Sequence, residues 1–456
     1  MKHGVTAVLT VLAILGAGCR PGPVEAPSEP PFARRTVVWT ESGDLGGVDA
    51  EALTAAGVDL LAVPVAEVDL SGDIPVVKTL RNEGWPGEIP IALVVRIERM
   101  RAGLDPGTAM PVWRVIRGSL AETVVPAEIV LDVPDVTADL APFVAQLAAE
   151  SAISVVPLVT PAQLQDPPVL EAVRAAGGCT VLAFGTVETV RPGAELSNLP
   201  LEDQLAPLVP LGIRPRVAVV LRPRSVPALG VWGDDLDPLT EPTATDIRTA
   251  SVLDRTFVFR KAVEWSGRTW KRGDSVALRW MDIPRLDRAL HESTNVVLPE
   301  VRGWDLVGLP PRGEALGMGR EALLAYLEGE GPWPSLEVSV DRKGRNLTVT
   351  LKNRSVFPSA VSAYGSWVEV RLGSGALVAK NPGDFDRIVL GTRKGGGWER
   401  MRDSRTADAV RFYETYVAPG EEMRSGTVRL PSSRSRATVS WRVVLSTGEE
   451  LSGTLR

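Results

Sequence analysis

Between residues 35 and 332, short apolar runs alternate with stretches that have helical spacing. The runs are TVVWT at 36–40, DLLAVPVAEV at 59–68, IPIALVVRI at 89–97, EIVLDV at 128–133, ISVVPLV at 153–159, CTVLAFGTV at 179–187, RPRVAVVL at 214–221 and NVVLPEV at 295–301. Continuous runs of Val, Ile and Leu are typical of strands that are buried on both faces of a parallel sheet. The pattern therefore predicts a strand at each run.

The intervening stretches predict helices. In 136–150, Leu140, Phe143, Val144 and Leu147 fall on one helical face. A second helix is expected to begin at Pro167-Pro168, and a third over 281–292. Strands alternating with helices predict a (β/α)₈ TIM-like barrel. An open doubly wound sheet is the alternative, but it would want a Gly-rich phosphate loop after its first strand, and TVVWTESGDLGGVDAE matches that loop poorly.

The seventh unit carries a long insertion between Leu221 and Asn295. Its sequence predicts a hairpin within 255–280 that turns at Ser266-Gly267 or at Arg272-Gly273. Long loops of this kind are uncommon in compact domains unless they have a function.

Residues 335–456 have a different pattern, of short strands separated by turns rich in Gly, Asn, Asp, Pro and Ser. This predicts an immunoglobulin-like or fibronectin-like β-sandwich after the barrel. The expected organisation is a signal peptide at 1–18, a Pro-rich tether at 19–34, the barrel at 35–332 and the sandwich at 335–456, with GEGPWP at 329–334 as the linker.

The N-terminus reads MKHGVTAVLTVLAILGAGC, with a basic start, an apolar run too short to span a bilayer, and small residues before Cys19. This resembles a lipobox, in which the cysteine is lipidated after cleavage, although Leu15 stands four residues before Cys19 and not three. The alternative is an ordinary secretory signal that contains a cysteine. We expect a lipid on Cys19 to hold the chain on a membrane in the cell envelope, on the periplasmic or cell-surface side.

Composition narrows the possible chemistry. The net charge of −6 gives no footprint for nucleic acid. Cys19 and Cys179 are the only cysteines, so a lipidated Cys19 leaves Cys179 without a disulfide partner. His291 is the one histidine after the signal, which leaves little for a histidine metal site or a Ser-His-Asp triad. We expect no metal and no cofactor.

Barrels place their sites at the carboxyl ends of the strands. Polar and aromatic residues expected there are Trp39, Glu67, Arg96, Asp132 with Asp135 just beyond it, Trp280 and Glu300. Carboxylates can act as the acid, base or nucleophile of a glycosidase, and indole rings can stack on sugars. Asp132, Asp135 and Glu67 are therefore the candidate catalytic residues, and Trp39, Arg96, Trp280 and Glu300 the candidate substrate contacts. The alternative is that these charges are merely solvated or paired with neighbouring arginines.

Five segments resemble the bacterial domain-of-unknown-function family 3142: VVWT, VDLLAVPVAEV, IALVVRI, EIVLDVPD and VVLPEVRGWDL. The resemblance covers roughly residues 35–330 and implies an exported protein with a glycosidase-like barrel. The family's fourth strand has an Asp-x-Asp spacing before a Pro-acid pair, and the corresponding segment of this chain resembles a shortened form of the acidic motif of chitinase-like barrels. Here Asp132-Val133-Pro134-Asp135 lacks the second Asp of that spacing, so only Asp132 and Asp135 carry over, and catalysis is expected to be weak or absent.

The sequence thus favours a cell-envelope lipoprotein whose glycoside-hydrolase-like barrel binds or weakly processes a glycan. The alternative is a non-catalytic binding or scaffold protein that contacts a protein partner through the sandwich and the insertion of the seventh unit.

Overall fold

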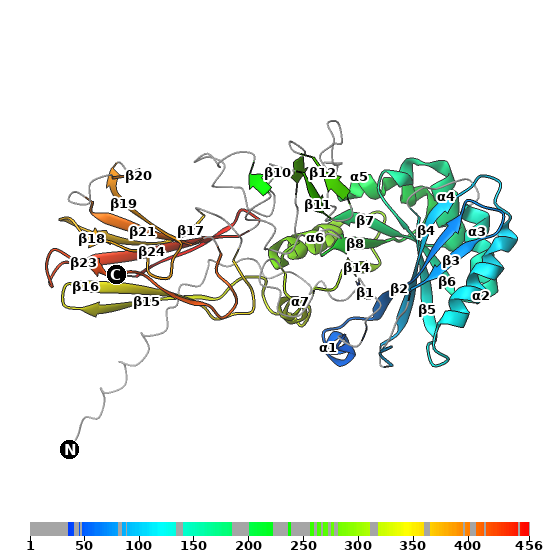
Figure 1. Cartoon of the computed structure of the whole chain (residues 1–456), viewed down its shortest axis with the longest axis horizontal. Coiled ribbons are helices and arrows are strands. Elements are labelled where there is room, and N and C mark those ends of the chain that lie inside the picture. Colours follow the sequence, from blue (N-terminus) through cyan, green and yellow to red (C-terminus); the bar gives the residue numbers. More distant parts are fainter. Residues whose placement is uncertain are drawn as a thin grey trace, which may run out of the picture.

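The computed structural model describes residues 35–40, 45, 48–80, 84–87, 89–133, 140–184, 200–221, 236–238, 256–259, 262–265, 268–271, 275–277, 281–310, 318–359, 365–394, 397–401, 407–414, 416–445 and 447–455. The first part of this chain forms a parallel barrel and the last part forms two antiparallel sheets. Figure 1 shows the barrel strands toward one end of an elongated molecule and the sandwich strands at the other.

The barrel is a closed parallel sheet. Its strands are β1 (Arg35–Trp39), β2 (Leu60–Leu70), β4 (Ile91–Met100), β5 (Pro126–Asp132), β6 (Ser154–Val159), β7 (Thr180–Phe184), β8 (Arg216–Val220) and β14 (Gly303–Val307). Each pairs in parallel with its neighbours, and pairing of β1 with β2 as well as with β14 closes the ring. The predicted (β/α)₈ barrel is confirmed.

Helices connect most of the strands. They are α1 (Ala50–Ala55), α2 (Ala109–Ser119), α3 (Leu140–Ser151), α4 (Pro167–Ala176), α5 (Leu201–Leu205), α6 (Ile283–Asn295) and α7 (Arg320–Leu327), with short 3₁₀ turns at Pro106–Thr108, Gln163–Gln165 and Ala206–Leu211. The helix expected from Pro167 begins there and ends at Gly177, whose φ of 69° suits glycine. The third expected helix is α6, where the side chain of the N-cap Asp282 accepts a hydrogen bond from the Arg285 backbone N–H.

The second unit departs from the predicted alternation. After β2 the chain turns back as β3 (Val76–Thr79), which pairs antiparallel with β2. Among the described residues between β2 and β4 there is no helix. A β-hairpin therefore takes the place of the expected second helix.

The eighth strand was misassigned by sequence. The run NVVLPEV does not form a strand: Val297–Glu300 is a turn, and the barrel is completed by β14, whose sequence is GWDLV. Pro299 lacks the N–H that a strand in the ring would need for its ladder. Glu300 therefore lies at the amino end of the last strand, β14.

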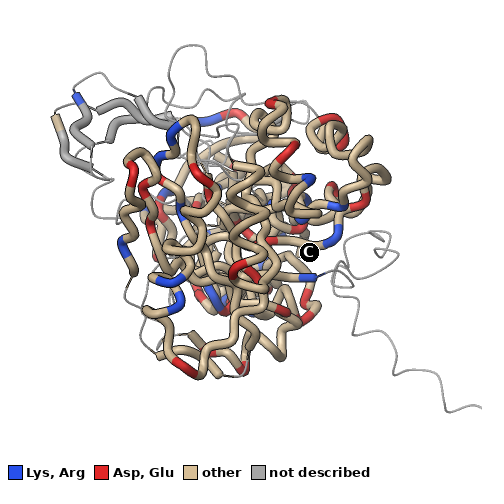
Figure 2. The backbone as a smooth tube through the Cα atoms, turned by 90° about the vertical axis from the view of Figure 1, so that its right-hand side faces the viewer, with Lys and Arg blue, Asp and Glu red and all other residues tan. Residues whose placement is uncertain are grey.

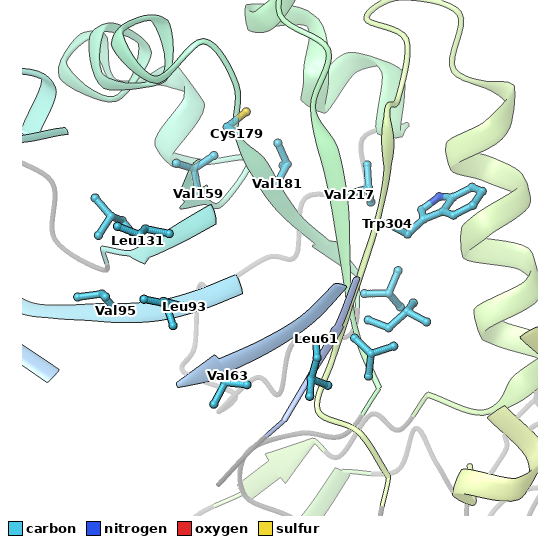
Figure 3. Close-up of a cluster of buried hydrophobic side chains, with 14 of the residues drawn as sticks. Leu61, Val63, Leu93, Val95, Leu131, Val159, Cys179, Val181, Val217 and Trp304 are labelled. Carbon is cyan, nitrogen blue, oxygen red and sulfur yellow. The ribbon is translucent and has the colours of Figure 1, made fainter. Parts of the chain in front are cut away.

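The side chains of the barrel strands alternate between the outer face, which the helices cover, and the inside of the barrel. Side chains such as Leu61, Val63, Leu93 and Val95 point outward into the layer that the helices cover, and Figure 3 shows them together with Trp304 and Cys179. Cys179 is buried, and burial raises the pKa of its thiol to about 12. Smaller side chains fill the inside, including Val37, Leu60, Ala62, Ala92, Val94, Val130 and Ala218.

Parts of the insertion between β8 and α6 form short antiparallel pairs. β10 (Thr256–Phe259) pairs with β9 (Leu236–Pro238) and β13 (Ser275–Ala277), and β11 (Val263–Trp265) pairs with β12 (Arg268–Trp270). Trp265 of β11 is in register with Arg268 of β12, and both predicted turn positions, Ser266-Gly267 and Arg272-Gly273, lie outside the described residues.

The sandwich consists of two sheets around a shared apolar core. One has the order β15 (Leu336–Lys343), β16 (Asn346–Asn353), β23 (Val428–Arg429) and β18 (Val378–Ala379), with β22 (Glu422–Arg424) also pairing with β16. The other has the order β20 (Gly397–Arg400), β19 (Arg387–Lys394), β21 (Ala409–Glu414), β17 (Ser366–Leu372), β24 (Ala437–Val444) and β25 (Glu450–Leu455). Val349 and Leu351 of β16 are buried against the same cluster as Val370 of β17 and Phe412 of β21, which is the inward alternation that a sandwich requires.

Two further features bear on localisation and partners. Within the described residues, no helix combines the length and apolarity needed to cross a bilayer. Acidic and basic residues are interspersed over the backbone in Figure 2, in agreement with the mixed charge of the sequence.

Candidate functional site

Three of the predicted residues lie in one row at the carboxyl ends of adjacent strands. Glu67 of β2 is in register with Arg96 of β4, and Arg96 is in register with Asp132 of β5. Lys78 of β3 lies in register with Glu67 on its other side. We call Lys78, Glu67, Arg96 and Asp132 the mouth row.

A β-bulge turns Glu67 toward the inside of the barrel. Leu60 and Ala62 face inward on β2, so strict alternation would place Glu67 on the outer face. The register of β2 against β4 shifts between Pro64 and Ala66, and after this shift Ala66 packs in the outer cluster. The extra residue reverses the alternation, as bulges do, and Glu67 then shares the inner face with Arg96 and Asp132.

Charges alternate along the mouth row. The Lys78 ammonium donates a 2.6 Å hydrogen bond to Glu67 Oε2, and the Arg96 Nε lies 4.0 Å from Asp132 Oδ2. The side chains of Glu67 and Asp132 are 27 % and 18 % exposed, whereas those of Lys78 and Arg96 are 70 % and 44 % exposed. The hydrogen bond to Glu67 and the charge of its carboxylate raise the pKa of Lys78. The acids are thus half-buried and engaged by cations that remain open to solvent.

The other predicted residues are not placed in this row. Trp39 ends β1 but is only 2 % exposed, and its indole N–H donates to Asp305 Oδ2 at 3.1 Å. Its ring packs in the inner apolar cluster and offers no open face for a sugar. Asp135 and Trp280 lie outside the described residues, as does the lipidation candidate Cys19.

Glu300 lies at the opposite end of the barrel from the mouth row. It precedes β14 and forms a 3.3 Å ion pair with Arg214, which itself precedes β8. Both side chains are more than half exposed. The predicted role of Glu300 at the mouth is therefore wrong, because the strand was assigned one segment too early along the chain.

Sequence reasoning missed a second set of charges inside the barrel. Arg216 of β8 donates to Glu128 of β5 through Nη1 and Nη2, at 2.9 and 2.6 Å. Its Nε lies 2.7 Å from Asp305 Oδ1 of β14. The three side chains are no more than 6 % exposed. We call Glu128, Arg216 and Asp305 the interior triad.

The surroundings of the interior triad are polar as well. The Thr180 hydroxyl of β7 donates to Asp305 Oδ2 at 3.3 Å, beside the indole N–H of Trp39. Arg35, which is one-third exposed, lies 3.6 Å from Glu128. Burial raises the pKa of the Asp305 carboxyl, and the charge of Arg216 opposes that shift. Burial also disfavours the charge on Arg216, but Asp305 and Glu128 outweigh it and the net effect raises its pKa.

A signal for this triad was present in the sequence. Glu128 opens the run EIVLDV, Arg216 lies within RPRVAVVL, and Asp305 interrupts GWDLV. A charge within a strand that is buried on both faces needs a partner of opposite sign, and strands on different sides of a barrel can supply one across its interior. No grouping of His, Cys, Asp and Glu among the described residues has the arrangement of a metal site.

Comparison with known proteins adds little beyond this geometry. No family model matches the chain, and no curated protein matches it. Among solved structures, a BuGH86 protein in complex with neoagarooctaose is 10 % identical with a TM-score of 0.28, over 76 % of this chain and 61 % of that one. A Paenibacillus cycloisomaltooligosaccharide glucanotransferase with cycloisomaltoheptaose is 9 % identical with a TM-score of 0.31, over 88 % and 85 %. The match to the first of these spans less than two-thirds of its length, and neither likeness is strong enough to assign a function.

Proposed function

We propose that the mouth row binds a hydroxyl-rich glycan, and that the chain presents this barrel in the cell envelope from a lipid on Cys19. The observation that carries the proposal is the shared register of Glu67, Arg96 and Asp132 on the inner faces of three neighbouring strands. The carboxyl ends of barrel strands are where barrel proteins bind their ligands.

Alternating charges suit hydroxyl groups. A sugar hydroxyl both donates and accepts hydrogen bonds, so it can donate to Glu67 or Asp132 while it accepts from Lys78 or Arg96. Three strand spacings of about 4.8 Å make the row roughly 14 Å long, which is enough to contact several rings of an oligosaccharide. The partial exposure of all four side chains leaves these donors and acceptors accessible.

The same geometry favours binding over hydrolysis. A glycosidase needs one carboxylic acid that carries a proton to the leaving oxygen. In the mouth row Glu67 accepts a hydrogen bond from Lys78, and Asp132 lies beside Arg96.

The test is a glycan array of neutral and N-acetylated oligosaccharides, probed with the purified chain. Arg96→Gln should weaken binding at least tenfold, because it removes the central cation of the mouth row. The matched control is Arg214→Gln, which breaks an arginine–glutamate pair at the far end of the barrel and should leave binding unchanged.

Two variants separate a binding barrel from an enzyme. Glycan binding that persists in Asp132→Asn without any measurable hydrolysis supports the proposal. Loss of binding in Trp280→Ala would identify Trp280 as a further contact to the sugar. Hydrolysis by the native chain that falls by about 10²-fold or more in Asp132→Asn would identify a general acid or base and refute the binding-only reading. Equal binding by the native chain and Arg96→Gln would remove the mouth row from the ligand site.

A further inference from the structure

We infer that the groove between β3 and α2 is a docking site for an extended, apolar peptide segment of a partner protein, which adds a strand to β3. This surface is separate from the mouth row and does not depend on the proposed glycan binding. It arises where the hairpin strand β3 replaces a barrel helix, so that one strand of the barrel sheet ends at an edge.

The outer edge of β3 offers unused backbone groups. Within the described residues β3 pairs with β2 alone. The Leu80 N–H donates to the Val65 carbonyl at 2.8 Å, and the register places Lys78 opposite Glu67. In an antiparallel pair every second residue bonds to the partner strand, so the backbone N–H and C=O groups of Lys78 and Val76 point toward β2. The N–H and C=O groups of Val77 and Thr79 therefore point away from it.

A concave surface of about 730 Å³ lies beside the first half of β3. It is lined on one side by Val76 and Val77 of β3, and on the other by Thr108, which precedes α2, and by Pro111 and Val115 of α2. Side chains of neighbouring strand residues point to opposite faces. Val76 and Val77 both line the groove, so it borders the strand β3 itself as well as one face of the sheet.

The groove is apolar where a globular surface would ordinarily be polar. Ile74, Val76 and Val115 are 79 %, 65 % and 45 % exposed, and all three line it. Exposed aliphatic side chains gathered around a concave surface mark an interaction site more often than single exposed residues do. An extended peptide satisfies both features, since its backbone pairs with the edge and its alternate side chains enter the groove.

Charge also bears on the occupant. Two carboxylates, Asp73 and Asp105, lie at the groove. Asp73 forms an ion pair with Arg101, whereas Asp105 accepts a hydrogen bond from the Gly107 N–H and has no ion-pair partner among the described residues. The peptide that fits best is therefore apolar at alternate positions and carries a Lys or Arg that can reach Asp105.

The test uses the full-length chain and a phage-displayed library of random peptides as the probe. Thr79→Pro removes one outward N–H and places a ring on the edge, while the Leu80 hydrogen bond to β2 stays in place. Thr79→Val is the matched control, because it keeps that N–H. Peptides selected on the native chain should show alternating apolar residues, and they should bind Thr79→Pro at least about fivefold more weakly than Thr79→Val, as expected for a lost hydrogen bond plus exclusion by the ring.

A second pair of variants tests the apolar lining. Val76→Thr should weaken the same peptides, whereas Val125→Thr, at another exposed valine that does not line the groove, should not. No enrichment of peptides on the native chain, or equal binding by Thr79→Pro and Thr79→Val, would overturn the proposal. A dimer of the native chain that Thr79→Pro dissociates would identify a second copy as the occupant and would also overturn it. Circular dichroism of each variant checks that a loss of binding does not reflect unfolding.

Discussion

Replacement of Arg216 by Met should destabilise the barrel more than any comparable change at its surface. Arg216 holds two carboxylates, with contacts of 2.6 and 2.9 Å to Glu128 and 2.7 Å to Asp305. All three side chains are buried, so the variant leaves Asp305 without its cation and Glu128 with only the more distant, partly exposed Arg35. Removing one partner of a buried ion pair costs about 3–5 kcal/mol, a large part of the roughly 5–15 kcal/mol by which domains are stable.

Arg214→Met is the matched control. Arg214 also pairs with a glutamate, Glu300, at 3.3 Å, but both side chains are exposed. Exposed pairs contribute about 0.2–1 kcal/mol because water and salt screen them. The difference between the stability losses of Arg216→Met and Arg214→Met therefore reports the burial of the ion pair and not merely the loss of an arginine.

The assay is hydrogen exchange of barrel and sandwich peptides through a urea titration. The sandwich peptides provide an internal reference, since Arg216 contacts none of the residues in the sandwich core. We expect the barrel midpoint to fall in Arg216→Met while the sandwich midpoint stays. The additional changes Glu128→Gln and Asp305→Asn should restore much of the stability, because they remove the stranded charges. A loss below about 1 kcal/mol, or equal losses in Arg216→Met and Arg214→Met, would refute this account of the triad.

Two further predictions concern the anchor and the sandwich. Cys19→Ala should release the chain from membranes, because acyl chains anchor stably and a Pro-rich tail does not; a variant that stays with membranes after a high-salt wash would contradict this. Burial, and then the charge of Asp386, raise the pKa of Glu414 from 4.5 to about 7. The protonated form is thereby favoured in the folded state. The stability that it contributes is fully present below pH 4.5 and is lost as the pH rises through 7. After solvent screening, the free energy of unfolding should fall by about 1–2 kcal/mol over this range. Urea titrations of the sandwich between pH 4.5 and 8 should show this fall, and Glu414→Gln should remove it.

Periodicity was sufficient to predict most of the barrel. Seven of the apolar runs became strands of the ring, because side chains on both of their faces had to be apolar to fill the inside and to pack under the helices. The eighth strand was assigned to the wrong segment because an apolar run was used as the criterion and the true strand is not continuously apolar. Asp305 breaks the apolar pattern of GWDLV, whereas NVVLPEV looks continuous but contains Pro299. A buried charge can mask a true strand when its partner lies far away in the sequence.

The prediction of a helix in the second unit was wrong for a local reason. Residues 71–73, Ser-Gly-Asp, form part of the turn between β2 and β3, and Asp69 accepts hydrogen bonds from the Ser71 N–H and hydroxyl. This is ordinary turn chemistry, in which an Asp side chain bonds the backbone two residues further on. The strand signal of VVKT was too short to recognise without its partner strand. The edge that it creates could only be seen once the sheet was assembled.

The site was predicted in part for a related reason. Rules about strand ends identified Glu67, Arg96 and Asp132, but the inward direction of Glu67 depends on a bulge that alternation alone would have missed. Pairing of acids with Lys78 and Arg96 depends on register, which a single sequence does not specify. The sequence therefore identified the residues at the mouth, while the fold determined which of them face one another.

The two groups of charges in the barrel have different tolerances to change. Asp305 is fully buried, and Trp39 donates to it while being only 2 % exposed itself. Val37, Ala62, Val94 and Val130 fill the interior with apolar side chains. The side chains of the interior triad are at most 6 % exposed, so we expect a substitution there to act through stability. The mouth row is partly exposed, so a substitution there can change binding while the barrel remains folded. Arg216→Met and Arg96→Gln should accordingly separate, with the first lowering the free energy of unfolding and the second lowering affinity at nearly constant stability.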